Sequence, residues 1–379
     1  MFDVSETALS GAAGTYGMGC CGLSHAASRV RMLAMIAGRR IGPSYAPTEG
    51  AASIRDALRA LRDSGVGAGA RGAPLEVQPK SDQAPRLERA TPLEGTVIRV
   101  RPVEGGAVVG FRAFLDGIQR SQVLAHIAGV PLVHGAVAAA IRLRTDRRLH
   151  TWGAPRVRQA LYAPHALLDA ALLASLGERI AVVDTMQADT PPVDSAVTAD
   201  APTAPRGPRH PQELVARALT AVQRAREAAE LALAAEWVAR GDGPLLVDGG
   251  TSGSADAAKS AQVVGVVKSH RTLYADEATL PLVLGMREGE RTTAMTVSSP
   301  RRNAVASWYL RLRDPAGRSP LFGLVRVETA LSDDITVRAD LVSRWLLAER
   351  TPVSLPDQRW DVMVYGIREC EQYLTAILK

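Results

Sequence analysis

The sequence predicts an α/β domain in which a mixed β-sheet is flanked by helices. Three observations predict this fold class. Apolar, β-branched runs follow one another from Gly95 to Arg144 and indicate consecutive strands. A long helical pattern covers residues 212–240 and is closed by a Gly-Asp-Gly stop. Short apolar strands then resume at Gly243 and continue to Glu328, so strands and helices are expected to share one core.

The early strands are expected to form an antiparallel meander. Residues 95–103 alternate apolar and polar side chains, and residues 105–117 follow as a strand that ends in Asp-Gly. Two further apolar runs, 121–130 and 131–144, are separated by a short break. Residues 155–176 are interpreted as helical.

The chain divides by composition into two regions. Residues 1–95 are rich in Gly, Ala and Pro and are interpreted as an N-terminal arm or small subdomain. Residues 96–379 form the main domain and end in two helices near 340–347 and 367–378. Within this domain, residues 186–211 are rich in Pro, Thr, Ala and Asp, which indicates a flexible insertion or linker.

Composition and charge narrow the possible settings. The net charge of +6 comes almost entirely from arginine, which pairs with phosphate in a bidentate fork, although a GC-rich genome also produces Arg- and Ala-rich chains. The three cysteines form neither a disulfide framework nor a zinc pattern. No stretch reaches the ~18 apolar residues of a membrane span, and the N-terminus lacks a signal peptide. We therefore expect a cytoplasmic protein with no membrane association.

Two aspartates are candidates for chemistry because each is expected at the end of an apolar strand. Asp116 follows Phe-Leu and Asp248 follows Leu-Leu-Val, and a glycine comes directly after each. Ligands tend to gather at such strand ends in mixed sheets. The alternative is that each pair is an ordinary Asp-Gly turn.

A glutamate on the long helix is the third candidate. Glu230 shares a helix face with the apolar residues Ala234 and Trp237, and a carboxylate there is costly to bury unless it is paired or binds a cation. The alternative is a solvated residue bridged to Arg226. Two other glutamates on this helix are rivals, Glu227 and, towards the opposite face, Glu236.

Two aspartates and a glutamate suit phosphodiester hydrolysis by two divalent cations about 4 Å apart. Mg²⁺ and Mn²⁺ prefer carboxylate oxygens. Lys268 ends the strand VVGVVKSH and could contact a phosphate, or could extend from a strand end into solvent. Arg311 and Arg326 lie in alternating strands, one face of which could line a DNA groove or could simply face solvent.

These features together resemble the NurA family, the nucleases that act with HerA-type hexameric ATPases. The resemblance covers roughly residues 105–379 and rests on motifs in the family's order. They are FLDGIQRSQ, the helix around REAAELALAAEW, PLLVDGGTSG, VVGVVKSHRTLY, WYLRL with GLVRVE, and VYGIRECEQYL. It implies an RNase H-like fold, Mn²⁺- or Mg²⁺-dependent cleavage of DNA, and a homodimer docked on a HerA-like translocase.

By position, the resemblance assigns catalytic or metal-binding roles to Asp116, Glu230 and Asp248. Many family members carry an Ala-His pair near the C-terminus, where this chain has Cys370 and Glu371. Glu371 is therefore expected to replace that histidine as the last metal ligand, and two acids are rivals for the position, Glu369 and Asp361.

We expect a metal-dependent deoxyribonuclease that serves DNA end resection, repair or antiviral defence. Lys268, Arg311 and Arg326 would contact the DNA backbone without reading sequence. One rival hypothesis is an inactive RNase H-like scaffold that binds DNA or a partner ATPase. A second is an unrelated enzyme with acid–base carboxylates, which predicts no DNA binding.

Overall fold

The structure is a computed structural model that describes residues 54–66, 75, 84–145, 148–186, 210–241, 243–299, 302–350 and 365–378. These residues belong to one compact unit, which runs from Thr48 to Lys379. Most of the insertion expected at 186–211, and Asp361, lie outside the described residues. None of the described helices combines the length and the apolar character needed to cross a membrane.

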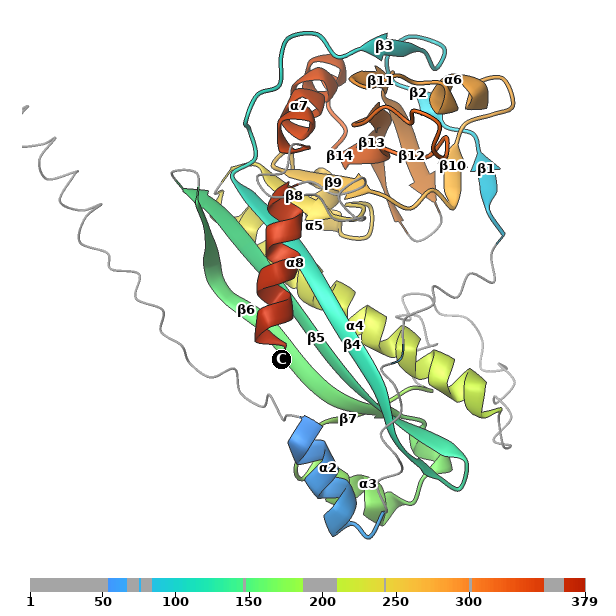
Figure 1. The fold of residues 1–379 in the computed structure, drawn as a ribbon, viewed down its shortest axis with the longest axis vertical. Coiled ribbons are helices and arrows are strands. Elements are labelled where there is room, and N and C mark those ends of the chain that lie inside the picture. The colour runs from blue at the N-terminus through green and yellow to red at the C-terminus, as the bar shows by residue number, and fades with distance from the viewer. Residues whose placement is uncertain are drawn as a thin grey trace, which may run out of the picture. The chain divides into compact units, whose positions relative to one another are not determined.

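A large mixed β-sheet dominates this unit, which confirms the predicted α/β class (Figure 1). In the described residues it has 12 strands, and its main path runs in the order β2-β12-β13-β14-β9-β8-β4-β5-β6-β7. Strands β3 and β11 pair beside β13, and β1 and β10 form a separate parallel pair. The strands are β1 (Arg86–Glu88), β2 (Thr91–Pro92), β3 (Val100–Pro102), β4 (Ala113–Ile127), β5 (Val130–Thr145), β6 (Arg148–Ala163), β7 (Val182–Asp184), β8 (Leu245–Asp248), β9 (Val263–Val267), β10 (Thr272–Tyr274), β11 (Glu290–Thr292), β12 (Met295–Ser299), β13 (Arg302–Arg311) and β14 (Leu324–Thr329).

The longest helix, α4, has clear local signals at both ends. Pro211 stands in its first turn, where the missing N–H costs nothing, and Gly241 ends it in the left-handed region at φ 65°. The helical elements are α2 (Ile54–Asp63), the short 3₁₀ helix η1 (His165–Leu167), α3 (Ala170–Gly177), α4 (Pro211–Arg240), α5 (Ala255–Lys259), α6 (Leu280–Leu284), α7 (Ile335–Glu349) and α8 (Tyr365–Ile377).

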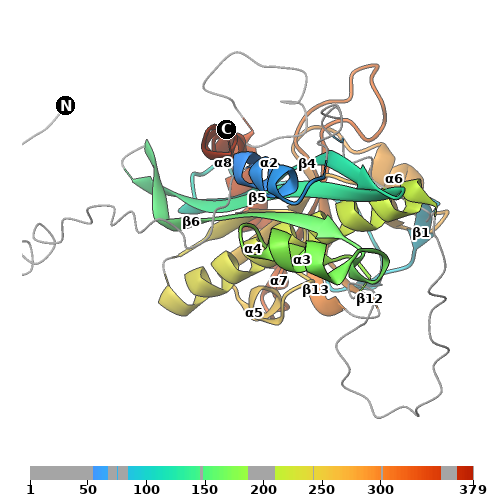
Figure 2. The same ribbon diagram turned by 90° about the horizontal axis from the view of Figure 1, so that it is seen from below.

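Helices cover both faces of the β4-β5-β6 region, as Figure 2 shows for α4 and α8. On one face, Leu233 and Trp237 of α4 pack with Ala113 and Leu115 of β4. On the other face, Leu374 of α8 packs with alternate alanines of β5. Successive side chains of a strand point to opposite faces, so β4 carries its residues alternately towards α4 and towards α8.

An antiparallel meander is present, but other residues form it than expected. Parts of the runs 105–117 and 121–130 make up the single strand β4, β5 follows it, and the third strand is β6, where a helix was expected. The first reversal of the chain comes at Ala128 and Gly129, which have φ values of 48° and 84°. Asp116 therefore lies inside the 15-residue strand β4 and is not followed by a turn. Gly117 continues the strand, opposite Ala139 of β5.

The helix expected over residues 155–176 is largely wrong. Residues 148–163 form β6, which pairs along β5, and only Ala170–Gly177 forms a regular α-helix in this stretch. The reason is tertiary: β5 is buried along most of its length and needs a partner for its backbone groups on this side.

The described residues before position 96 are part of this unit and pack against its sheet. Ala57 and Leu61 of α2 belong to the same apolar cluster as Leu124 of β4 and Leu132 of β5. Strand β2 pairs with β12 at one end of the sheet path.

Candidate carboxylate site

Asp116 and Asp248 occupy matching places on neighbouring parallel strands. Leu115 of β4 pairs in register with Val247 of β8, so the two aspartates are the next residues of each strand. The residues before them on the same face, Phe114 and Leu246, share one apolar cluster. By alternation, both aspartate side chains leave the sheet on that face. The strand-end position predicted for Asp248 is confirmed, because β8 ends at this residue.

Asp116 is a buried carboxylate whose negative charge has few compensating hydrogen bonds. Its side chain accepts a hydrogen bond from the N–H of Gly117 at 2.8 Å, and the residue is only 6% exposed. Burial and the nearby charge of Asp248 raise its pKa well above the ordinary value, and Glu230 adds to the effect, while Lys268 lowers it. The electrostatics therefore bring together four of the residues that the sequence singled out.

Lys268 supplies the nearest positive charge to the aspartates. It follows β9, whose Val266 pairs in register with Asp248. Its Nζ lies 2.7 Å from Oδ2 of Asp248, and both side chains are about one quarter exposed. Lys268 thus holds Asp248 at the open end of the parallel strands.

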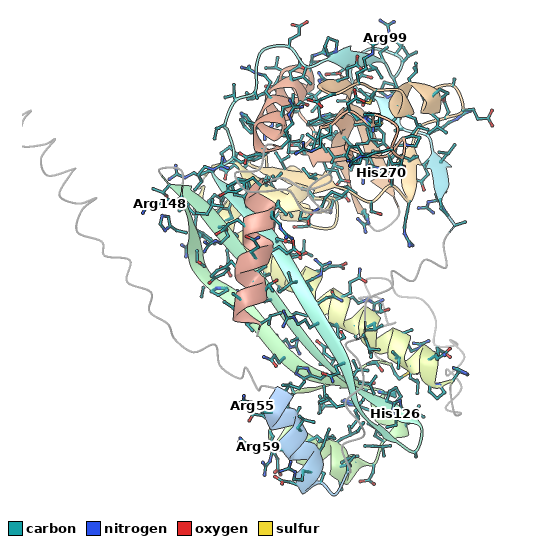
Figure 3. All side chains as sticks on the ribbon, in the orientation of Figure 1. Arg55, Arg59, Arg99, His126, Arg148 and His270 are labelled. Carbon is teal, nitrogen blue, oxygen red and sulfur yellow. The ribbon has the colours of Figure 1, made fainter. Side chains whose placement is uncertain are left out.

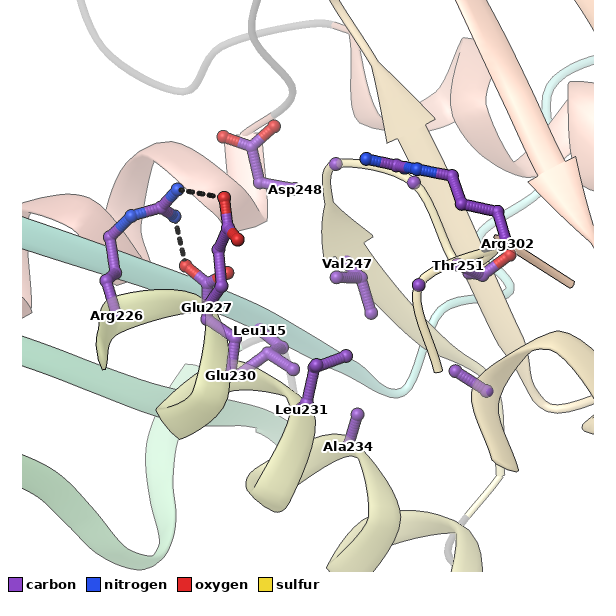
Figure 4. Close-up of a pocket in the computed structure, with 14 residues that line it drawn as sticks. Leu115, Arg226, Glu227, Glu230, Leu231, Ala234, Val247, Asp248, Thr251 and Arg302 are labelled. Carbon is purple, nitrogen blue, oxygen red and sulfur yellow. Dashed lines mark hydrogen bonds and ion pairs between the residues drawn. The ribbon is translucent and has the colours of Figure 1, made fainter. Parts of the chain in front are cut away.

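Glu230 approaches β4 from α4, on the face of the sheet opposite to the one that carries the Asp116 side chain. Its side chain is 12% exposed and forms an ion pair with Arg226, one turn earlier (Figure 4). Burial raises the pKa of Glu230 to about 7, although Arg226 lowers it. Gly117 makes this approach possible, because a Cβ there would collide with Oε1 of Glu230.

A cavity of about 220 Å³ has Glu227, Glu230 and Asp248 among its lining residues, whereas Asp116 does not line it (Figure 4). Thr251 also lines it, and its buried Oγ1 has no hydrogen-bond partner. The rival Glu236 is directed elsewhere, because it pairs with Arg156 at an exposed position. Glu230 is therefore the helix glutamate most closely associated with the aspartates.

Helix α8 places three consecutive residues in different surroundings. Glu369 makes a bidentate contact with Arg142, at 2.9 and 2.7 Å. The Cys370 thiol donates to the carbonyl of Ala140 at 3.3 Å, and its pKa is raised by burial and by Asp116. Glu371 pairs with Arg368 of its own helix at 3.0 Å. Its assignment as the last metal ligand stays a prediction.

The structure corrects the DNA-contact role expected for Arg311. This residue is fully buried, and its guanidinium donates to the carbonyls of Leu284, Met286, Pro320 and Phe322. The alternation of β13 does not mark a solvent face around Arg311, because residues 305–311 of this strand are covered on both faces. Arg326 remains 11% exposed and pairs with Glu328 at 2.6 Å.

The donor set suits a divalent cation in its chemistry. Carboxylate oxygens are the preferred ligands of Mg²⁺ and Mn²⁺. The pKa of Asp116 is raised first by burial and then by the charge of Asp248, and a cation at this place would oppose both effects. Among the described residues, however, no group of three or more His, Cys, Asp or Glu side chains is gathered closely enough to hold a metal ion. Two of the three acids instead pair with basic side chains, Asp248 with Lys268 and Glu230 with Arg226.

Two residues of this region were not chosen from the sequence as functional candidates. Cys370 borders Asp116, and Arg302 lines the cavity beside Asp248. Cys370 is far from Asp116 along the chain, and Arg302 is far from Asp248, so no local sequence pattern indicated either residue.

Comparisons with protein-family models and with curated proteins find no match to this chain.

Proposed function

We propose that this chain is a divalent-metal-dependent DNA nuclease with an RNase H-like core. The observation that carries the proposal is the matched position of Asp116 and Asp248 on parallel strands, with Glu230 approaching from α4. The resemblance of the sequence to the NurA family supports it. We extend the proposal to a cytoplasmic homodimer that acts with a HerA-type hexameric ATPase in DNA end resection, repair or defence.

In this proposal, Asp116, Glu230 and Asp248 hold Mn²⁺ or Mg²⁺, and Glu371 completes the set. The cations would neutralise the scissile phosphate and lower the pKa of the attacking water. Lys268, 2.7 Å from Asp248, is placed to exchange its carboxylate partner for a phosphate oxygen when DNA is bound. Gly117 leaves the space in which Glu230 reaches the strand.

The test is digestion of end-labelled DNA in Mn²⁺, with and without a HerA-type ATPase. We expect Asp116→Asn, Asp248→Asn and Glu230→Gln to lower the cleavage rate by at least about 100-fold. Glu236→Gln is the matched control, because Glu236 lies on the same helix but pairs with the exposed Arg156. Full activity in both aspartate variants would refute the proposal.

The second candidate is an inactive RNase H-like scaffold that binds DNA or a partner ATPase. It is favoured by the contacts of Lys268 with Asp248 and of Arg226 with Glu230, which leave these acids paired without a metal. A scaffold predicts salt-dependent DNA retention with no cleavage in Mn²⁺, and no effect of Mn²⁺ on the melting temperature.

A further inference from the structure

A second cavity, which we call the arginine pocket, lies beside the carboxylate site. Its volume is about 370 Å³, and its lining includes Arg86, Arg271, Arg302 and Arg326. Arg302 lines both this pocket and the cavity that contains Glu230 and Asp248. The two cavities are therefore neighbours, although one is lined by acids and the other by arginines.

The arginine pocket carries an excess of positive charge. Glu328 is the one acid among its lining residues. That carboxylate is already engaged, because it pairs with Arg326 and accepts the N–H groups of Thr251 and Ser252 at 2.7 and 3.2 Å. Glu88, outside the lining, pairs with Arg86 at 2.8 Å, so the four arginines outnumber these two acids. A concave surface with such an excess of positive charge attracts an anion.

Arg326 is held in place before any ligand arrives. It donates to Oγ of Ser307 at 3.2 Å and to Glu328, and its guanidinium lies 5.1 Å from the ring centre of Tyr274. A fixed guanidinium loses less conformational freedom on binding than a mobile one. Arg86, Arg271 and Arg302 lie at exposed positions and give the pocket an accessible rim. Arg86 pairs there with Glu88, and Arg302 donates to Oγ of Ser252 at 3.4 Å.

The chemistry of the lining matches a phosphate group. Arginine presents parallel N–H donors that fit phosphate oxygens, and the pocket adds the hydroxyls of Ser269 and Ser298 and the amide of Asn303. Its volume falls within the range of about 300–1,000 Å³ that is typical of small-ligand sites. A nucleotide phosphate is thus of suitable size and charge.

We propose that the arginine pocket binds a phosphate group of a nucleotide, adjacent to the carboxylate site. Two sources share this chemistry, a free nucleotide and a phosphate of a DNA strand. The position of Arg302 between the two cavities favours the strand, because a chain bound at the acids would extend past this residue. The choice of DNA as the source rests on the proposed function.

The experiment measures binding in EDTA, where no cleavage occurs. The probes are dAMP and a short single-stranded oligonucleotide, prepared with a phosphate or a hydroxyl at each end. Arg271→Ala and Arg302→Ala are compared with Arg148→Ala. Arg148 is an exposed arginine that starts β6 and does not line the pocket (Figure 3). His270, labelled in the same figure, stands in the sequence between the lining residues Ser269 and Arg271.

We expect the two pocket variants to bind at least one probe about tenfold more weakly than the wild-type protein, with Arg148→Ala unchanged. Loss confined to dAMP identifies a free nucleotide as the ligand, and loss that depends on a terminal phosphate of the oligonucleotide identifies a strand end. Unchanged affinity for every probe in both pocket variants, or an equal loss in Arg148→Ala, would overturn the proposal. Equal melting temperatures without ligand verify that the variants fold.

This readout is separate from the test of nuclease activity. Cleavage by the wild-type protein in Mn²⁺ with no phosphate binding at the pocket would count against the arginine pocket alone. Phosphate binding that the pocket variants lose, in a protein that does not cleave DNA, would count against the proposed nuclease alone.

Discussion

Arg291 and Asp116 are both buried in the same sheet, but their surroundings differ. Arg291 is fully buried, and its guanidinium contacts Glu94 at 2.8 Å and Asp340 at 2.6 Å. Burial lowers the pKa of Arg291, but the hydrogen bonds with these acids raise it overall. At Asp116, burial and the neighbouring Asp248 both disfavour the charged form.

The two groups differ in how far opposite charges compensate the buried charge. Around Arg291, opposite charges on β11, on α7 and near β2 satisfy one another and hold those segments together. Around the carboxylate site, Asp116, Glu230 and Asp248 repel one another, and the protein retains this unfavourable arrangement. Strongly perturbed pKa values at a cavity are characteristic of functional sites. The first group therefore contributes to stability, and for the second we propose a role in chemistry.

The largest expected effect is the loss of folding stability when Arg291 is replaced. Arg291→Ala leaves Glu94 and Asp340 without their shared partner, and we expect the free energy of unfolding to fall by about 3–5 kcal/mol. Arg156→Ala is the control, because it removes an exposed pair with Glu236 and should cost less than about 1 kcal/mol. Urea unfolding measures both. Equal losses in the two variants would break the distinction between buried and exposed pairs.

The second prediction concerns pH and Glu230. Its pKa is raised from 4.5 to about 7, so the folded state holds a proton that the unfolded state releases. The stability that the protonated carboxyl of Glu230 contributes is fully present below 4.5, its pKa in the unfolded chain. It is lost as pH rises through about 7, its pKa in the folded protein. In EDTA, we expect the wild-type protein to lose up to about 3 kcal/mol over this range relative to Glu230→Gln.

Urea unfolding at pH values on either side of this range is the measurement. Glu236→Gln should follow the wild-type curve, because Glu236 is exposed and remote from the aspartates. A wild-type stability that rises with pH relative to Glu230→Gln would contradict the buried position of this carboxylate.

The smallest effect is expected at the C-terminal helix. If Glu371 is the last metal ligand, Glu371→Gln should weaken Mn²⁺ binding by about tenfold with little change in the melting temperature. Glu369→Gln should lower the melting temperature and leave Mn²⁺ binding nearly unchanged, because Glu369 pairs with Arg142 and not with the carboxylate site. Calorimetric Mn²⁺ titration of the two variants decides between them. Unchanged Mn²⁺ affinity in Glu371→Gln would remove it from the ligand set.

The sequence predicted the elements whose signals are local. The apolar run that ends at Asp248 and the helix that carries Glu230 both appear as expected. The role of Gly117 could not be predicted in this way. The Asp-Gly pair is typical of a turn, whereas here the glycine sits inside β4 and leaves room for Glu230, a residue distant in the chain.

The same reasoning explains the errors at β6 and Arg311. Residues 155–163 form a strand because β5 pairs with them, and that partner is not encoded in their own periodicity. An alternating strand usually has one solvent-facing side, but residues 305–311 of β13 are covered on both, so Arg311 is buried among carbonyls. Contacts between distant segments decided both cases.

The most direct test of the central claim is the melting temperature of wild-type protein and Asp116→Asn, each measured in EDTA and in Mn²⁺. Asparagine removes a buried charge that is repelled by Asp248, so the variant should be more stable than wild type in EDTA. Mn²⁺ should raise the melting temperature of the wild-type protein and leave that of the variant nearly unchanged. A wild-type melting temperature that does not respond to Mn²⁺, together with a variant that is less stable in EDTA, would contradict a metal-binding role for these carboxylates.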